Sequence, residues 1–199
     1  MKRKNFLKCS CSIGLASCVG LGTVAGESLF AKVTEDEIID KKNPLIPVDT
    51  RQVQNVLSHV ENTMDENVKK SIFDKLGYEH TTDPGFIDWI NGYKKDLKKF
   101  FDRINSDKDT YWEKIEYDPK ISAIKITGKP VDRCACAYAQ AENAPKSLCN
   151  YCCKSFEKHM FEMLLDKTVR VEVNEAFLLG GKRCSSTIYV SGTLQLNKI

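Results

Sequence analysis

Five of the nine cysteines in this chain lie in one short stretch, residues 133–160. In Cys134-Ala135-Cys136, an extended backbone would place both thiols on the same face, because side chains alternate along a strand. The apolar spacing after residue 147 predicts a helix that ends near residue 165. Three more cysteines begin the apolar stripe of this helix, and they are Cys149, Cys152 and Cys153.

Together these segments predict a shared thiol site. If the extended segment packs on the helix, four or five sulfurs converge, and Cys184 on the last predicted strand is a sixth candidate. Cys149 lies in the first turn of the helix, where backbone N–H groups and the helix dipole lower the pKa of a thiol. Cys149 and Cys152 are therefore the candidate nucleophiles. The side chains expected to bind a ligand around them are Cys134, Cys136, Tyr138, Cys153 and Cys184.

Other uses of these thiols stay open at this point. Cysteine is also a common small apolar core residue. An exported chain can pair its cysteines, for example Cys134 or Cys136 with Cys149 or Cys152. The same four residues could instead supply thiolates to a structural zinc ion or an iron–sulfur cluster. The main interpretation, a ligand-binding site with a nucleophilic thiolate, requires no cofactor.

The first 25 residues have the layout of an export signal: a basic start, an apolar stretch rich in Gly and Ser, and small residues up to Ala25. Two variants are a twin-arginine-like signal and a lipoprotein signal with Cys18 as the lipidated residue. The segment contains four of the basic residues, and without them the formal charge of +3 becomes −1. Nucleic-acid binding needs clustered basic residues, so we exclude it. We expect an exported protein, periplasmic or associated with the cell envelope, that meets a membrane only through its signal or a lipid anchor.

The rest of the chain is expected to be a polar tether, residues 26–47, followed by one domain, residues 48–199. Helical spacing predicts helices starting near Asp49, from Asp65 to a C-terminal Gly77, and from Asp83 to Ile104. Alternation predicts strands on both sides of residues 118–119 and a hairpin formed by residues 168–190. This order predicts an α+β fold, with N-terminal helices packed on one face of an antiparallel sheet and a cysteine-rich helix between strands.

Glu175 is the third candidate catalytic residue. It follows the alternating run Val169-Arg170-Val171-Glu172-Val173 and faces the same side as the valines. A carboxylate at this position lies either at the rim of the sheet or inside a pocket that raises its pKa. His159 is expected to be a surface or packing histidine on the flank of the cysteine-bearing helix.

The motif order between about Val68 and Val190 resembles a cysteine-rich bacterial family. The motifs are a Cys-x-Cys segment, a cysteine-rich helix start, a V-x-V-E strand and a Gly-x-x-Cys hairpin closing on Cys184. The family is similar to L-2-amino-thiazoline-4-carboxylic acid hydrolase proteins, and more distantly to 4-vinyl-reductase-like ligand-binding domains. The resemblance implies an α+β fold with a small-molecule pocket and a hydrolase acting on non-peptide C–N bonds. It also implies catalytic or binding roles for Cys134, Cys136, Cys149, Cys152 and Cys184.

The sequence therefore favours an exported small-molecule-binding domain with a cysteine-lined site, acting as a thiolate-dependent hydrolase of a small compound that bears a carboxylate. Two alternatives remain. One is a metal-binding or redox-sensing module whose thiols hold zinc or an iron–sulfur cluster. The other is a non-enzymatic envelope protein stabilised by disulfides.

Overall fold

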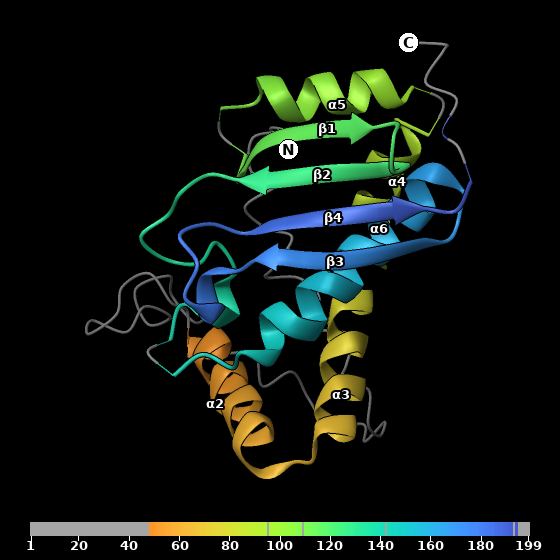
Figure 1. Cartoon of the computed structure of the whole chain (residues 1–199). Coiled ribbons are helices and arrows are strands. Elements are labelled where there is room, and N and C mark those ends of the chain that lie inside the picture. Colours follow the sequence, from red (N-terminus) through yellow and green to blue (C-terminus); the bar gives the residue numbers. More distant parts are fainter. Residues whose placement is uncertain (1–47, 95, 109, 142, 193, 195–199) are drawn as a thin grey trace, which may run out of the picture.

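The computed structural model describes residues 48–94, 96–108, 110–141, 143–192 and 194. The predicted export signal, the Cys18 lipidation site and the tether lie outside these residues. The described chain forms an α+β fold with a four-stranded antiparallel sheet in the order β1-β2-β4-β3 (Figure 1). The strands are β1 (Trp112–Asp118), β2 (Ala123–Gly128), β3 (Val169–Glu175) and β4 (Ser185–Val190).

One face of the sheet forms the main core. The strands alternate, so that Ile115, Ile124, Val171 and Ile188 are buried on the helix side. The other face is more polar, and there the guanidinium of Arg170 lies 4.0 Å from the centre of the Tyr189 ring. Both predicted strand pairs are confirmed in the sheet, where β1 pairs with β2 and β3 with β4.

Three helices pack on the sheet, and they are α4 (Pro84–Asn91), α5 (Leu97–Ser106) and α6 (Lys154–Leu165) (Figure 1). Their apolar side chains cover this face. The single helix predicted from Asp83 to Ile104 is wrong, because the chain forms two helices there. Gly92 ends α4, and the Asp96 side chain accepts a hydrogen bond of 2.9 Å from the backbone N–H of Lys99 to start α5.

Helices α2 (Val48–Thr63) and α3 (Glu66–Glu79) pack beside the sheet against the cysteine-bearing segments (Figure 1). Asp65 caps α3, as its position predicts, by accepting hydrogen bonds from two backbone N–H groups of the first turn. Gly77 does not end α3, contrary to the prediction, because the helix continues to Glu79. No described helix is both long enough and apolar enough to cross a bilayer.

The two cysteine-bearing segments have different backbones. The helix predicted from residue 147 to residue 165 is confirmed, but its first turn is a π-helix, η4 (Leu148–Cys153), which continues into α6. The predicted Cys-x-Cys strand is wrong. Cys134-Ala135-Cys136 is irregular and leads into a short 3₁₀ helix, η3 (Ala137–Ala139). It pairs with none of the described strands.

Candidate functional site

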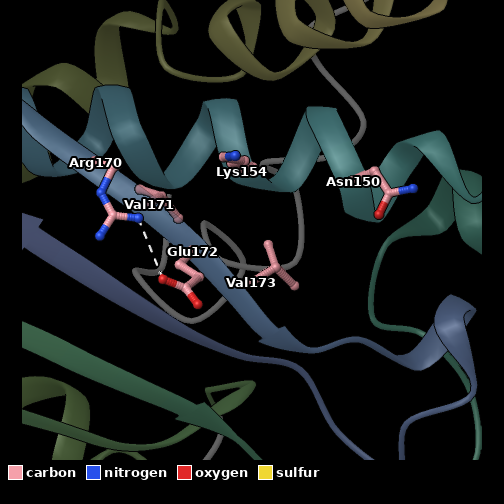
Figure 2. Close-up of a pocket in the computed structure, with 6 residues that line it drawn as sticks. All are labelled: Asn150, Lys154, Arg170, Val171, Glu172 and Val173. Carbon is pink, nitrogen blue, oxygen red and sulfur yellow. Dashed lines mark hydrogen bonds and ion pairs between the residues drawn. The ribbon is translucent and has the colours of Figure 1, made fainter. Parts of the chain in front are cut away.

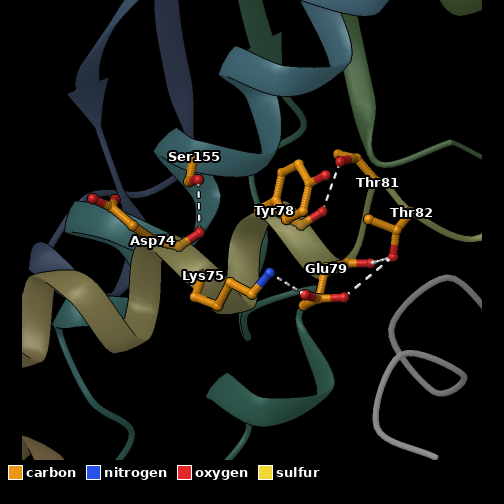
Figure 3. A network of polar contacts seen from close by, with 7 residues as sticks. All are labelled: Asp74, Lys75, Tyr78, Glu79, Thr81, Thr82 and Ser155. Atoms are coloured by element: carbon orange, nitrogen blue, oxygen red, sulfur yellow. Dashed lines mark hydrogen bonds and ion pairs between the residues drawn. The ribbon is translucent and has the colours of Figure 1, made fainter. Parts of the chain in front are cut away.

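The thiol-bearing turn η4 is held tightly against α3. A Cβ atom added to Gly77 would lie 2.2 Å from the carbonyl oxygen of Cys152, so only glycine allows the two backbones this close. The hydroxyl of Ser155 donates a hydrogen bond of 2.8 Å to the carbonyl of Asp74 (Figure 3). π turns within helices are rare and occur frequently at functional sites. The close crossing with α3 therefore fixes the position of the turn that carries the thiols.

All six described cysteines are thiols and form two overlapping groups, because Cys153 interacts electrostatically with Cys136 and Cys152 as well as with Cys149. Cys134 and Cys152 belong to a buried cluster with Leu57 and Phe73, and Cys136 packs against this cluster. The irregular segment thus lies beside the cysteine-bearing helix, as the sequence predicts. This first group is surrounded by apolar side chains from α2 and α3, which is the environment of packing residues.

Cys149 and Cys153 form the second group, one helical turn apart. The neighbouring thiol of Cys153 lowers the pKa of Cys149. The backbone N–H of Leu178 lowers it further, while burial and the carboxylate of Glu157 act in the opposite direction. The same sulfur–sulfur contact, together with burial, raises the pKa of Cys153 well above its ordinary value. Cys149 is therefore the sulfur of the pair that ionises first.

Cys184 and Tyr111 connect the two groups. Burial raises the pKa of the Cys184 thiol, which interacts electrostatically with Cys149. Burial and the neighbouring Cys184 thiol raise the pKa of Tyr111, and Cys134 adds to this effect. The Tyr111 ring lies against Gly128, where an added Cβ would come within 3.0 Å of two ring atoms. Tyr111 therefore lies near both Cys184 and Cys134, and its hydroxyl is buried without a hydrogen-bond partner among the described residues.

Glu157 is a partly buried acid on α6 whose charge acts on Cys149. Burial raises the pKa of Glu157 to about 7, against a smaller lowering by the neighbouring Ser186 hydroxyl on β4. Its Oε2 atom is buried and has no hydrogen-bond partner among the described residues. An ionised carboxylate is costly in such a place unless it is paired, so the neutral acid is favoured.

The raised pKa of Glu157 predicts a pH-dependent stability. The native carboxyl holds its proton more tightly than the unfolded chain does, so its contribution is fully present below pH 4.5 and is lost as the pH rises through about 7. We expect the free energy of unfolding to fall by about 2 kcal/mol over this range, an effect that Glu157→Gln removes. Denaturant unfolding of both proteins between pH 4.5 and 8 measures it. If the free energies of unfolding of the two proteins depend on pH in the same way, the pKa of Glu157 is not raised.

Glu175, the third candidate catalytic residue, lies at the rim of the sheet. Its Oε1 accepts hydrogen bonds from the backbone N–H groups of Lys182, at 2.7 Å, and Arg183, at 3.3 Å. A Cβ atom on Gly181 would lie 2.5 Å from the Cγ of Glu175, so the connection is closed tightly over this side chain. Through these contacts, the Glu175 side chain fixes the backbone of the connection between β3 and β4.

A groove of about 310 Å³ lies between the cysteine-bearing helix and the edge strand β3 (Figure 2). Its lining residues are Asn150, Lys154, Arg170, Val171, Glu172 and Val173. Arg170 is paired with Glu172 at 3.4 Å, whereas Lys154 has no ion pair with a described residue. Val173, on the floor of the groove, pairs in the sheet with Ser186 of β4.

The metal alternative gains no support from this geometry. Within the described ranges, no three His, Cys, Asp or Glu side chains are arranged to hold one metal ion. Cys134 and Cys152 face the α2–α3 side, whereas Cys149 interacts with Cys153 and Cys184. The four-thiolate site from Cys134, Cys136, Cys149 and Cys152 remains a prediction from spacing alone.

Tyr138, a predicted ligand-binding residue, and His159 both make aromatic contacts. Tyr138 is buried, and its ring stacks on His80 with the ring centres 6.1 Å apart. His159 packs edge-on against Tyr78 at 4.9 Å, and burial lowers the pKa of His159. His159 is thus a packing histidine on the flank of the helix, as the sequence predicts.

Three further residues near the thiols were not predicted from the sequence: Glu157, Ser186 and Tyr111. The signal for Glu157 was present, since it follows Cys149 and Cys153 by eight and four residues and so shares their side of the helix. Ser186 and Tyr111 carry no comparable local signal. Their positions depend on the pairing of β4 and on the loop before β1, and both of these are set by contacts distant in sequence.

The fold and this site define an α+β domain with a half-buried thiol and carboxyl centre. No family model matches the chain, and no curated protein matches it. Among solved structures, the chain is similar to a trafficking protein particle complex subunit 3 from Naegleria fowleri, which was crystallised covalently bound to palmitic acid. The two share 12% sequence identity with a TM-score of 0.46, over 74% of this chain and 98% of the other. A likeness of this degree carries no inference about the function of this chain.

Proposed function

We propose that this chain is an exported small-molecule-binding domain that hydrolyses a non-peptide C–N bond of a small carboxylate through the Cys149 thiolate. The observation that carries the proposal is the setting of the Cys149 sulfur. The neighbouring Cys153 thiol and the Leu178 backbone N–H both lower the pKa of Cys149 and so favour a thiolate. The resemblance to thiazoline-carboxylate hydrolases favours the same class of reaction.

The groove beside the helix supports a small ligand. Its volume of about 310 Å³ falls at the lower end of the range for small-molecule sites, about 300 to 1,000 Å³. Lys154 supplies the one positive charge of the lining that no described acidic group neutralises. A ligand carboxylate would pair with Lys154, which lies on the same helical segment as Cys149 and five residues after it, although Cys149 itself does not line the groove.

The reaction begins with attack of the Cys149 thiolate on the carbon of a C–N bond in an amide-like or amidine-like group. The C–N bond breaks, the nitrogen leaves with a proton, and a thioester or an equivalent acyl-sulfur bond forms. Water then attacks this carbon, the carbon–sulfur bond breaks, and the thiolate returns. Because Cys149 is only 2 % exposed, the site selects against bulky acyl groups.

A covalent intermediate tests the proposal. Incubation of the reduced full chain with p-nitrophenyl acetate is expected to release a burst of nitrophenol and to add one acetyl group to Cys149, located by peptide mass mapping. An acetyl group placed on Cys136 or Cys153 with Cys149 unmodified would exclude Cys149 as the nucleophile.

A further inference from the structure

The two edges of the sheet, β1 and β3, differ in how their backbone groups are used (Figure 1). On β1, the side-chain amide of Asn105 from α5 hydrogen-bonds to both backbone groups of Ile115. Its Oδ1 accepts from the N–H at 2.8 Å, and its Nδ2 donates to the carbonyl at 3.0 Å. An unpaired strand edge is a template for pairing with another chain, and proteins usually cover it. Asn105 therefore closes the β1 edge at its centre.

The hydrogen bonds at the start of β3 show which of its backbone groups point away from β4. The N–H of Ser191 donates to the carbonyl of Thr168 at 3.1 Å, so Thr168 bonds toward the β4 side. The N–H of the next residue, Val169, donates instead to Oε1 of Glu162 on α6, at 3.4 Å. Successive residues of an antiparallel strand direct their backbone groups to alternate sides. The odd-numbered residues of β3 therefore direct their backbone groups outward.

Val171 and Val173 carry the outward groups at the middle of β3. Neither residue has a strand partner on that side within the described part of the chain. Both line the groove beside α6, as Figure 2 shows. The Val171 side chain is buried in the core, so this residue meets the edge through its backbone alone. The β3 edge has no counterpart of Asn105, and its central backbone groups remain available to another strand.

The charges on β3 are self-complementary about Val171. Arg170 and Glu172 flank it on the polar face of the sheet, with 65% and 52% of their side-chain surfaces exposed. Suppose that a second copy of β3 lies antiparallel with the two Val171 residues opposite each other. Arg170 of each copy then lies opposite Glu172 of the other, and opposite charges at such positions stabilise a strand pair.

The charges also select this register. Outward backbone groups meet only when odd-numbered residues lie opposite odd-numbered residues, so the next possible registers are shifted by two residues. One of these shifts places Arg170 opposite Arg170 of the second copy, and the other places Glu172 opposite Glu172. Like charges directly opposite destabilise a strand pair. Within one chain, Arg170 and Glu172 pair at 3.4 Å, an exposed contact that contributes little and is easily exchanged.

We propose that β3 is the surface through which this chain binds a second copy of itself, with the two β3 strands antiparallel and centred on Val171. The two sheets then form one continuous sheet across the interface. This inference goes beyond the proposed function and does not depend on the Cys149 reaction. Two short strands bury less surface than the roughly 1,200–2,000 Å² of a standard interface. We therefore expect a reversible dimer with a dissociation constant of about 10 to 100 μM.

The test is sedimentation velocity of the reduced full chain at concentrations from about 5 to 500 μM, a range that spans the expected dissociation constant. Arg170→Glu and Glu172→Arg each place like charges in both cross-strand pairs, so each should weaken the dimer about tenfold or more. The double substitution Arg170→Glu with Glu172→Arg restores opposite charges. Its dimer should match that of the unsubstituted chain within about threefold.

A mixture of the two single variants gives the sharpest readout. When Arg170→Glu pairs with Glu172→Arg, both cross-strand pairs again join opposite charges. An equimolar mixture should therefore dimerise although neither variant does so alone at the same concentration. Because restored association requires folded chains, this result cannot come from misfolding of either variant.

Lys114→Glu is the matched control on the other edge of the sheet. Lys114 and Glu116 flank Ile115 on β1 as Arg170 and Glu172 flank Val171 on β3, and they pair at 2.6 Å with side chains 60% and 49% exposed. The charge pattern of the two edges is thus the same. Only β1 has its central backbone groups occupied by a side chain, so Lys114→Glu should leave the dimer unchanged.

Three results would overturn the proposal. A chain that stays monomeric over the whole concentration range does not use this edge to bind a second copy. Self-association that Arg170→Glu leaves unchanged, or that the mixture does not restore, takes place through another surface. An equal loss in Lys114→Glu would show a general effect of charge. None of these results bears on Cys149, whose acetylation tests the proposed function separately.

Discussion

Replacing Gly77 with alanine is expected to lower the free energy of unfolding by about 3 kcal/mol or more, although alanine is normally the better helix former by about 1 kcal/mol. The added methyl would lie 2.2 Å from the carbonyl oxygen of Cys152 and 2.8 Å from the Cβ of Ser155. Both neighbours are backbone or near-backbone atoms, which cannot rotate away. The only relief is to move α3 away from η4, which would also open the buried cluster around Phe73.

Gly92→Ala is the matched control for this substitution. Gly92 also lies at a helical backbone conformation, with φ −63° and ψ −13°, and an added Cβ would approach nothing closer than 3.3 Å. We expect Gly92→Ala to change stability by less than about 1 kcal/mol in either direction. Chemical denaturation monitored by circular dichroism measures both. Equal stabilities of the two variants would show that α3 does not approach η4 as closely as described.

Replacing Cys149 with alanine is expected to reduce hydrolysis by about 1,000-fold or more, because the variant has no sulfur at the position where the covalent bond would form. The loss of one buried sulfur atom should cost only about 1 kcal/mol of stability, so the variant should remain folded. Steady-state kinetics on a small amide or ester substrate, with circular dichroism to establish folding, measures the effect.

Cys152→Ala is the control that separates a chemical role from packing. Cys152 is as buried as Cys149 and lies on the same turn, but it faces the apolar cluster with Cys134 and Phe73. The sequence placed Cys149 and Cys152 together as candidate nucleophiles, and this pair of variants distinguishes them. A larger loss of turnover in Cys152→Ala than in Cys149→Ala would reverse the assignment.

Local patterns predicted most of the fold. The alternation of Val169, Val171 and Val173 and the turn near Pro119 specify strands whose one face is buried, and all four strands form. The starts of two helices were also predicted at Asp65 and Asp83, and each of these side chains accepts backbone hydrogen bonds at a helix start. These features depend on residues close in sequence, which is why one sequence was enough.

The predictions that failed depend on contacts distant in sequence. Gly77 has the residue type of a helix end, yet it is retained inside α3 because η4, more than 70 residues away, packs on it. The apolar periodicity from Phe86 to Ile104 continues through a break, because both halves pack on the same face of the sheet. The Cys-x-Cys segment has the alternation of a strand but no ladder partner.

The site was predicted in part. The spacing of Cys149, Cys152 and Cys153 placed the thiols on one side of a helix, and the structure brings Cys134 and Cys136 to that helix. Spacing did not show which thiol has a lowered pKa. The neighbouring Cys153 thiol and the backbone N–H of Leu178 lower the pKa of Cys149, and Leu178 is distant from Cys149 in sequence.

The most direct test of the central claim is the pH dependence of alkylation at each of the six described thiols, measured with iodoacetamide on the reduced full chain and resolved by peptide mass mapping. The account predicts that Cys149 titrates below the ordinary thiol value of about 8.5 and that Cys153 and Cys184 titrate above it. If Cys149 titrates at or above the ordinary value, or if Cys153 ionises before it, the thiolate centre described here does not exist.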